Sequence, residues 1–306
     1  MIDNLIEKYL DFLKEEKLAS SNTMEAYATD LNQLKKFLTN YDSNETTTPE
    51  DKLTKSKIQA YLVSLRERNY KETTLARKTV VARTFIKFLV GEGHLSKELI
   101  DGLESPKMIK GLPKFLTVEE VDDLLEQPAR KKTPEALRDK AMLSLAYGTG
   151  LRASELVALD LEDITISSSP VTLRTIGKGE KERILVLEPS SIEDLKRYLN
   201  EVRPKFEKAN KGNPDPALFL NRRGARLTRQ GFWLIVKLYG QQAGIGFTVT
   251  PHMLRHSYAT HQLSGGRNLR ELQEALGHAS LQTTQIYTQL TNEHLREQYD
   301  KAHPRA

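Results

Sequence analysis

The first part of the chain carries apolar residues at helical spacing. In the opening segment they recur every three or four residues, and a second segment repeats the pattern on one face. Two further segments of this kind follow, at residues 58–68 and 73–90. The positions that define the first two faces are Ile2, Leu5, Ile6, Tyr9, Leu10, Leu13, Tyr27, Leu31, Leu34 and Leu38. Residues 1–105 are therefore predicted to form a helical domain.

The pattern changes after residue 105. Residues 106–114 combine proline, glycine and lysine without a clear period, which is typical of a linker between domains. Thr117 and Glu120 then have the spacing of a capping box, and a helical pattern runs to Tyr147. Residues 115–306 are predicted to form a second domain.

Within the second domain, a short region alternates β-branched residues. Residues 164–166, 171–176 and 182–189 favour strands, and the glycine-rich stretch GKGEK joins the last two as a hairpin. From residue 190 to about 299 the pattern is helical again, with Pro251 suited to the first turn of a helix. The predicted fold class is mainly α with a small antiparallel β-sheet.

Composition excludes several kinds of site. The 306 residues include no cysteine, which removes disulfides, thiolate metal sites and cysteine nucleophiles. The N-terminus lacks the basic and apolar regions of a signal peptide, and no apolar run has the length of a membrane span. No Walker loop or GxGxxG motif offers a nucleotide cradle. We expect a cytoplasmic protein without a cofactor.

Charge is concentrated in two segments. The net charge is only +5, but residues 65–87 hold seven basic and two acidic residues, and residues 221–229 hold four arginines and no acid. Either segment alone is compatible with a solvated surface, whereas both together favour a polyanion such as DNA. Thr228 is expected to cap a helix whose N-terminus faces DNA. The candidate DNA-binding residues are Arg77, Lys78, Arg83, Lys87, Arg222, Arg223, Arg229 and Gln230.

Three motifs carry residues that could act on a phosphate. Arg152 lies in YGTGLRASEL, whose small residues would leave backbone N–H groups free at a helix start. Lys178 lies between two glycines at the expected hairpin tip. His252 and Arg255 lie in TPHMLRHSYATH, three residues apart and thus on one helix face. Taken alone, Arg152 and Lys178 are more typical of ordinary surface positions, and a single histidine is as compatible with a structural role.

Zinc binding by the histidines is not favoured. His252 and His256 have a suitable spacing, but neither a glutamate base nor a carboxylate ligand accompanies them. His256 and His261 are assigned structural roles. Arg255 and His252 are expected instead to form an anion site.

Tyr287 completes the set. It lies nine residues after His278, within the polar stretch LGHASLQTTQIYTQL. Arginines can neutralise charge on nonbridging phosphate oxygens, a lysine or histidine can protonate a leaving oxygen, and a tyrosine can attack phosphorus. Together these residues predict phosphoryl transfer through a protein nucleophile.

The motifs GLRASEL, GKGEKER, PHMLRHSYATH and LGHASLQTTQIYTQ, in this order, resemble those of the tyrosine recombinases. The resemblance spans the chain and is strongest to the bacterial XerC/XerD group, with the tail YDKAHPRA leaning towards XerC. It implies a two-domain, C-shaped DNA clamp with an N-terminal helical core-binding, SAM-like domain and a catalytic domain. It also implies site-specific recombination, such as resolution of chromosome dimers at a dif-like site, without metal or ATP.

The resemblance also implies a role for each matching residue. Arg152 and Arg255 would hold the scissile phosphate, and Lys178 would protonate the leaving 5′ oxygen. His252 would assist proton transfer, and His278 would stabilise the transition state by a hydrogen bond. Tyr287 would form the 3′-phosphotyrosyl intermediate.

The implied partners are double-stranded DNA and further recombinase subunits. A homo- or hetero-tetramer would hold two DNA sites, with a second Xer-type recombinase and an FtsK-type DNA translocase as further partners. The segment 292–306, with Leu295 and Tyr299, would pass to a neighbouring subunit. Two alternatives remain open, namely an integrase of a phage or mobile element with the same chemistry and a DNA-binding protein without catalysis.

Some positions depart from the family pattern. Gln289 stands where a histidine is common, and Arg267 and Asn268 replace a more acidic stretch. The loop at residues 167–170 is slightly long. None of these positions is among the six expected catalytic residues.

Overall fold

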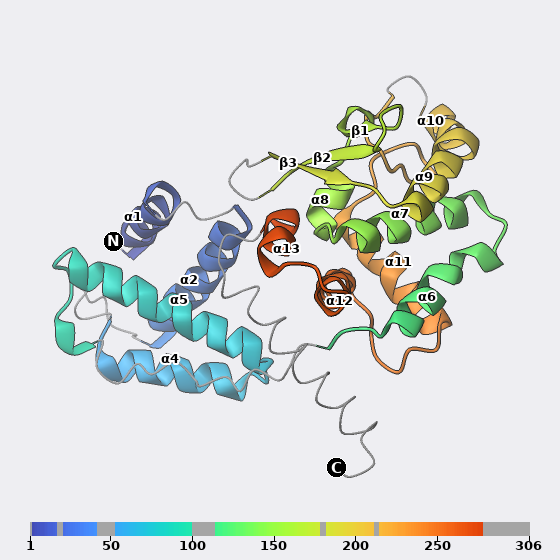
Figure 1. The fold of residues 1–306 in the computed structure, drawn as a ribbon. Coiled ribbons are helices and arrows are strands. Elements are labelled where there is room, and N and C mark those ends of the chain that lie inside the picture. The colour runs from blue at the N-terminus through green and yellow to red at the C-terminus, as the bar shows by residue number, and fades with distance from the viewer. Residues whose placement is uncertain are drawn as a thin grey trace, which may run out of the picture. The chain divides into compact units, whose positions relative to one another are not determined.

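A computed structural model shows two compact units, residues 1–111 and 112–306 (Figure 1). The structure describes residues 2–16, 21–41, 53–99, 114–177, 182–210 and 214–277. The predicted linker lies outside the described residues except for Lys114, and the clamp arrangement stays a prediction. Within the described ranges, no helix has both the length and the apolar character that crossing a membrane requires.

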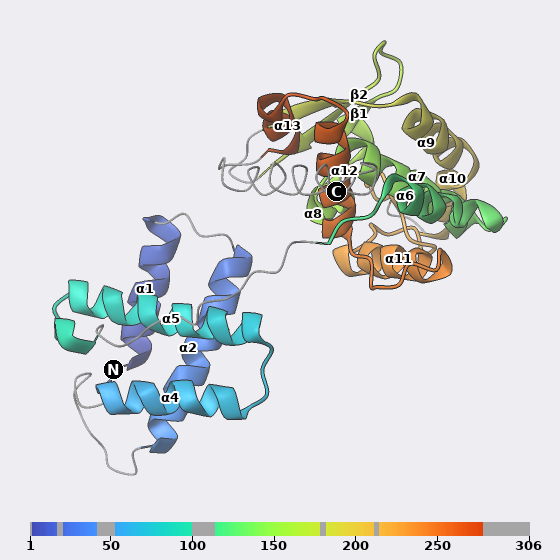
Figure 2. The same cartoon turned by 60° about the horizontal axis from the view of Figure 1, so that its bottom comes forward.

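The described residues of the first unit form helices (Figure 2), and their buried apolar side chains make up a core. Its elements are α1 (Ile2–Glu15), α2 (Ser21–Tyr41), α4 (Lys55–Glu67), α5 (Glu72–Gly91) and the 3₁₀ helix η1 (Lys97–Leu99). The apolar positions predicted for α1 and α2 face this core, with Tyr9, Leu31 and Leu34 almost fully buried. The expectation of helices in this part of the chain is confirmed.

The second unit is mainly helical and contains one small sheet. Its first elements are α6 (Val118–Glu126), η2 (Pro128–Arg130), α7 (Pro134–Thr149), α8 (Ala153–Ala158), η3 (Leu161–Asp163) and the strands β1 (Ile164–Thr165), β2 (Thr172–Ile176) and β3 (Glu182–Val186). The helices that follow are α9 (Pro189–Glu201), α10 (Arg203–Ala209), α11 (Arg229–Gln242), α12 (Pro251–Ser264) and α13 (Leu269–Leu276). The strands pair antiparallel in the order β1-β2-β3. The predicted fold class is confirmed.

Local sequence signals start several of these helices. Thr117 and Glu120 form the predicted capping box of α6. The Thr228 hydroxyl accepts a hydrogen bond from Gly231 N–H at 3.0 Å and caps α11 as expected. Thr250 caps α12, with Pro251 in its first turn. These caps satisfy N–H groups that the first turn of a helix leaves without partners.

The prediction of continuous helix after residue 190 is wrong for the described residues 214–228. This segment has no helix and forms isolated bridges, Asp160 with Ala217 and Leu220 with Arg226. The Asp215 carboxylate accepts from the backbone N–H groups of Ala217 and Arg226, and the Arg226 guanidinium binds the Asp160 carboxylate. In these tertiary contacts the polar side chains of Asp215 and Arg226 bind other parts of the unit, whereas a surface helix would have left them in solvent.

Candidate active site

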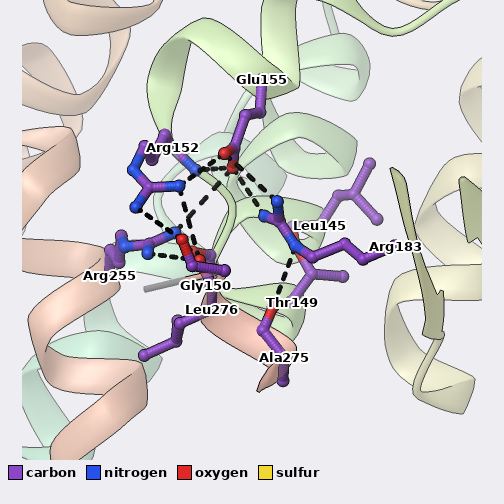
Figure 3. Close-up of polar contacts among 10 residues, drawn as sticks. Leu145, Thr149, Gly150, Arg152, Glu155, Arg183, Arg255, Ala275 and Leu276 are labelled. Atoms are coloured by element: carbon purple, nitrogen blue, oxygen red, sulfur yellow. Dashed lines mark hydrogen bonds and ion pairs between the residues drawn. The ribbon is translucent and has the colours of Figure 1, made fainter. Parts of the chain in front are cut away.

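Arg152 and Arg255 converge from separate elements (Figure 3). Arg255 on α12 is only 2% exposed, and its guanidinium donates to the carbonyls of Gly150 and Leu276, both at 2.7 Å. Arg152 immediately precedes α8, and its guanidinium donates to the Glu155 carboxylate at 2.7 Å. The Arg152 side chain remains 36% exposed. One arginine is thus fixed inside the unit, and the other is held at its surface.

Gly150 makes this approach possible. It ends α7 with a φ of +63°, a left-handed conformation that glycine adopts without a steric cost. A Cβ atom here would lie 2.5 Å from the Tyr258 ring and 2.8 Å from Leu276. The glycine therefore brings the end of α7 against α12 and α13, with its carbonyl on Arg255.

Glu155 is the buried acid between the arginines. Its carboxylate accepts from the Arg152 guanidinium, from the Arg152 backbone N–H at 2.8 Å and from Arg183 at 2.7 Å. The Nη1 atom of Arg255 lies 3.9 Å away. Burial raises the pKa of Glu155, but hydrogen bonds from Arg183 and Arg152 and the charge of Arg183 outweigh it and lower the pKa overall. Glu155 is therefore ionised at neutral pH.

The small residues around Arg152 were expected to leave backbone N–H groups free for a phosphate. The backbone N–H of Arg152 itself donates to Glu155. The partly exposed guanidinium is the group that Arg152 offers to an anion.

The end of α13 meets the same cluster. The carbonyls of Ala275, Leu276 and Gly277 accept hydrogen bonds from Arg183 at 3.0 Å, Arg255 at 2.7 Å and Arg152 at 3.2 Å, respectively. The C-terminal end of a helix carries partial negative charge, so these contacts are electrostatically favourable. Gly277 is the last described residue, and the chain continues directly into His278.

His252 lies on the same helix as Arg255, in its first turn. Its side chain is exposed, and its ring meets that of His256 with centroids 4.4 Å apart. Partial desolvation and the charges of Arg255 and Arg152 lower the pKa of His252. At neutral pH the imidazole is therefore neutral and able to accept a proton.

The other two histidines of this motif have contacts within the fold. His256 is buried on α12, and the Nδ1 atom of His261 lies 2.8 Å from the Tyr147 hydroxyl. In the part of the chain that the structure describes, no three His, Asp or Glu side chains gather as metal ligands would. The purely structural role expected for His256 and His261 stays a prediction.

Three of the predicted catalytic residues are not described. Lys178, His278 and Tyr287 all lie outside the described residues. The structure therefore brings together Arg152, Arg255 and the neighbouring His252.

Sequence reasoning missed Glu155 and Arg183. Both lie inside motifs that were singled out, GLRASEL and GKGEKER. Glu155 follows Arg152 by three residues, which is a spacing that allows contact at a helix start. No comparable signal links Arg183 to Glu155, since β3 and α8 meet only in the folded unit.

Among the predicted DNA-contact residues, Lys78 is not available at the surface. It is 6% exposed, and its ammonium donates to the Asp30 carboxylate at 2.7 Å and to Gln33. Its expected place on an open basic face is wrong, because a buried Asp30 requires a cation close by. Arg77 also pairs with Asp30 but remains partly exposed.

The remaining candidates keep exposed or partly exposed side chains. Lys87 is exposed, whereas Arg83 is only partly exposed. In the second unit, the exposed candidates are Arg222, Arg223, Arg229 and Gln230. Their contact with DNA stays a prediction.

Comparison with known proteins supplies the context for this site. The phage integrase family model matches residues 114–294, and the model of its N-terminal SAM-like domain matches residues 6–93. A protein named tyrosine recombinase XerC from Herpetosiphon aurantiacus is 43% identical over 97% of this chain and 94% of its own. One named XerD from Listeria innocua is 40% identical over the full length of both chains.

A solved structure agrees with these relatives. The crystal structure of the XerH site-specific recombinase bound to a palindromic difH substrate, in a post-cleavage complex, has a TM-score of 0.72 and 25% identity to this chain. The match covers 95% of this chain and 82% of XerH. Two relatives that match over nearly their full length and one solved structure thus point to the same tyrosine recombinase family as the sequence motifs.

Proposed function

We propose that this chain, which belongs to the phage integrase family of tyrosine recombinases, is an Xer-type site-specific recombinase that cuts and rejoins DNA through Tyr287. The observation that carries the proposal is the convergence of Arg152 and Arg255, with His252 on the helix that bears Arg255. The end of α13, which leads into the segment of His278 and Tyr287, meets the same two arginines.

The two arginines would hold the scissile phosphate. Each guanidinium can donate paired hydrogen bonds to phosphate oxygens and can offset the charge that develops during substitution at phosphorus. Arg255 is held in place by two carbonyls, so little ordering is required when a phosphate arrives. The exposed side of Arg152 supplies the second set of donors.

The reaction has two substitution steps. The Tyr287 oxygen attacks the scissile phosphorus, the bond from phosphorus to the 5′ oxygen breaks, and Lys178 donates a proton to that oxygen. His278 stabilises the transition state by a hydrogen bond. The 5′ hydroxyl of the recombining strand then attacks the 3′-phosphotyrosyl bond, and tyrosine leaves with a proton restored. The covalent bond conserves the energy of the phosphodiester, so no ATP is required.

The Tyr287 proton needs an acceptor, because an ordinary tyrosine with a pKa of about 10 is almost fully protonated at neutral pH. His252 fits this role, since its lowered pKa leaves the imidazole neutral. A bound water is the other acceptor consistent with the motif, since Lys178 is used as the proton donor to the 5′ oxygen. A phosphate bound by two arginines also favours the phenolate close by.

The Xer role rests on the full-length relatives. Proteins named XerC and XerD match nearly the whole chain at 40% identity or more. We propose that the protein acts in the cytoplasm on a dif-like chromosomal site and resolves chromosome dimers. A tetramer on two DNA sites would exchange the segment 292–306 between subunits, and a second Xer-type recombinase and an FtsK-type translocase are its proposed partners.

The nucleophile is tested with a nicked suicide DNA, which traps the covalent intermediate because the short cleaved fragment diffuses away. The unmodified protein is expected to form a covalent adduct, and Tyr287→Phe is expected to form none, because only the hydroxyl can attack phosphorus. DNA affinity should change less than about threefold, since one hydroxyl contributes little to binding dominated by phosphate contacts. Denaturing gels measure the adduct, and gel shift measures the affinity.

The same assay run with EDTA gives the control for metal. The unmodified protein should still form adduct, since arginines and Lys178 supply the charges and the proton. Adduct formed by Tyr287→Phe would refute the nucleophile, and complete loss on chelation would refute the metal-independent mechanism. Equal adduct formation by the unmodified protein and by Tyr287→Phe would point to a different tyrosine as the nucleophile.

A further inference from the structure

Arg183 connects three elements of the site. It lies on β3, and its guanidinium donates to Glu155 Oε2 at 2.7 Å, to Glu155 Oε1 at 3.3 Å and to the Ala275 carbonyl at 3.0 Å (Figure 3). Its side chain is 11% exposed. A Cβ atom on Gly277 would lie 3.0 Å from the Arg183 guanidinium, so the glycine leaves room for it. Arg183 therefore joins β3, the start of α8 and the end of α13.

The three arginines of this cluster differ in how closely they contact the Glu155 carboxylate. Glu155 is a single buried acid, and three arginines surround it. Arg183 makes a two-bond contact with Glu155, whereas Arg152 makes one side-chain bond and Arg255 lies at 3.9 Å. Two-bond contacts are the stronger and more directional of these. Arg183 is thus the main counter-charge of Glu155.

We propose that Arg183 is a positioning residue for the phosphate site, one that neutralises Glu155 so that Arg152 and Arg255 remain available to the scissile phosphate. The inference rests on the proposed function, because it assumes that these two arginines bind a phosphate. Arg183 itself makes no contact with DNA in this proposal. It acts through Glu155 and through the carbonyl end of α13.

The expected consequence of losing Arg183 follows from the charges. A buried carboxylate without its main partner draws on the nearest cations, which are Arg152 and Arg255. Its negative charge also opposes a phosphate bound to those same arginines. Both effects depend on the charge of Glu155 and on the charge of the phosphate, and this dependence separates positioning from a general loss of structure.

The experiment measures single-turnover cleavage of the suicide DNA by Arg183→Gln, Glu155→Gln and the double variant. Arg183→Gln should cleave on the order of tenfold more slowly or worse, because donors to the phosphate are withdrawn. DNA affinity should change less than about threefold, since phosphate contacts elsewhere are untouched. The double variant should cleave faster than Arg183→Gln, because the uncompensated charge is gone.

A neutral substrate gives a second readout. A methylphosphonate at the scissile position removes one negative charge from the group that the arginines hold. The defect of Arg183→Gln, relative to the unmodified protein, should be smaller on this DNA than on phosphate. A purely structural role for Arg183 would slow cleavage of both substrates by the same factor.

Arg174→Gln is the matched control. Arg174 lies on β2 of the same hairpin, but its side chain is 42% exposed and pairs with Glu162, Asp163 and Glu182. Exposed ion pairs contribute little, so cleavage should stay within about twofold of the unmodified protein. Thermal unfolding shows whether each variant is folded, and Arg183→Lys, which keeps the charge beside Glu155, should cleave faster than Arg183→Gln.

The outcomes distinguish this inference from the proposed function. If the unmodified protein forms no adduct, the proposed function fails and the inference fails with it. If it forms adduct but Arg183→Gln cleaves normally, only the inference is overturned. If Arg183→Gln slows cleavage of the phosphate and methylphosphonate DNA by the same factor, the inference about Arg183 is overturned. A double variant that cleaves no faster than Arg183→Gln also overturns it. Neither result contradicts the proposed function.

Discussion

His256 lies buried on α12, one turn after the catalytic candidate His252 and in contact with its ring, and this burial makes stability depend on pH. Burial, together with the neighbouring His252 and Arg255, lowers the pKa of His256 to about 4. An unfolded histidine titrates near 6.5. Between these values the unfolded chain takes up a proton that the folded chain does not, so the unfolding free energy falls as the pH drops from about 6.5 to 4. Above this window the group contributes no pH dependence.

Replacing His256 with Gln should flatten the pH profile in that window. Urea unfolding of both proteins between pH 4 and 7.5 measures the effect, and their difference at pH 7.5 sets the reference for packing. The unmodified protein should lose up to roughly 3 kcal/mol more than His256→Gln on acidification, since each pKa unit corresponds to about 1.4 kcal/mol. Parallel profiles would show that His256 titrates normally in the fold.

At the level of single residues, the sequence motifs identified Arg152 and Arg255 but not the side chains that bind them. Arg152, Arg255 and His252 were predicted from short motifs, and the structure brings the two arginines together. Glu155 lies three residues after Arg152, so that pair has a local spacing that was overlooked. Arg183 was missed because an ion pair between distant elements leaves no local pattern. Lys78 was misplaced for the same reason, since Asp30, its buried partner, lies on another helix.

Gly150 shows how a single backbone position holds elements together. Gly150→Ala places a methyl group within 2.5 Å of Tyr258 and imposes a left-handed conformation on alanine. The conformation alone costs on the order of 1 kcal/mol, and the overlap adds to it. We expect the unfolding free energy to fall by about 2 kcal/mol or more and cleavage to slow, because the Gly150 carbonyl holds Arg255. Chemical unfolding and adduct formation measure the two effects.

Gly244→Ala is the matched control for that prediction. Gly244 has a φ of +73°, but a Cβ atom there meets nothing within 4 Å. Its substitution should therefore cost only the conformational part, about 1 kcal/mol, and leave cleavage unchanged. Equal losses for the two glycines would mean that the contact of α7 with α12 and α13 is looser than the structure shows.

Elements with local signals were predicted well, and one segment without them was not. The caps at Thr117, Thr228 and Thr250 and the alternation in the strands act within a few residues, so the sequence displays them. The segment 214–228 has its geometry imposed by Asp215 and Arg226, which bond across it and to Asp160. Intrinsic helix propensity has little influence where such tertiary contacts determine the backbone conformation.

For the whole molecule, the sequence predicted two parts, and the structure contains two compact units. Each unit has its own apolar core, which is why a change of pattern near residue 105 was visible in the sequence. How the units act together on DNA depends on charged surfaces, and surface charge carries no periodic signal. The basic clusters at residues 65–87 and 221–229 therefore need a direct test.

Salt dependence provides that test, because each phosphate contact releases counterions when it forms. Losing one contact to duplex DNA should lower the slope of log affinity against log salt by about 0.9. Arg77→Ala with Lys87→Ala in the first unit should lower the slope by up to about 1.8, and Arg222→Ala with Arg223→Ala in the second unit by a similar amount. Combining all four should give the sum, since the two pairs lie in different units. Lys196→Ala with Arg197→Ala removes two exposed cations of α9, outside both clusters, and should leave the slope unchanged. An unchanged slope for either test pair would place that surface in solvent, and a change for the control pair would show that the slope reports net charge rather than contact.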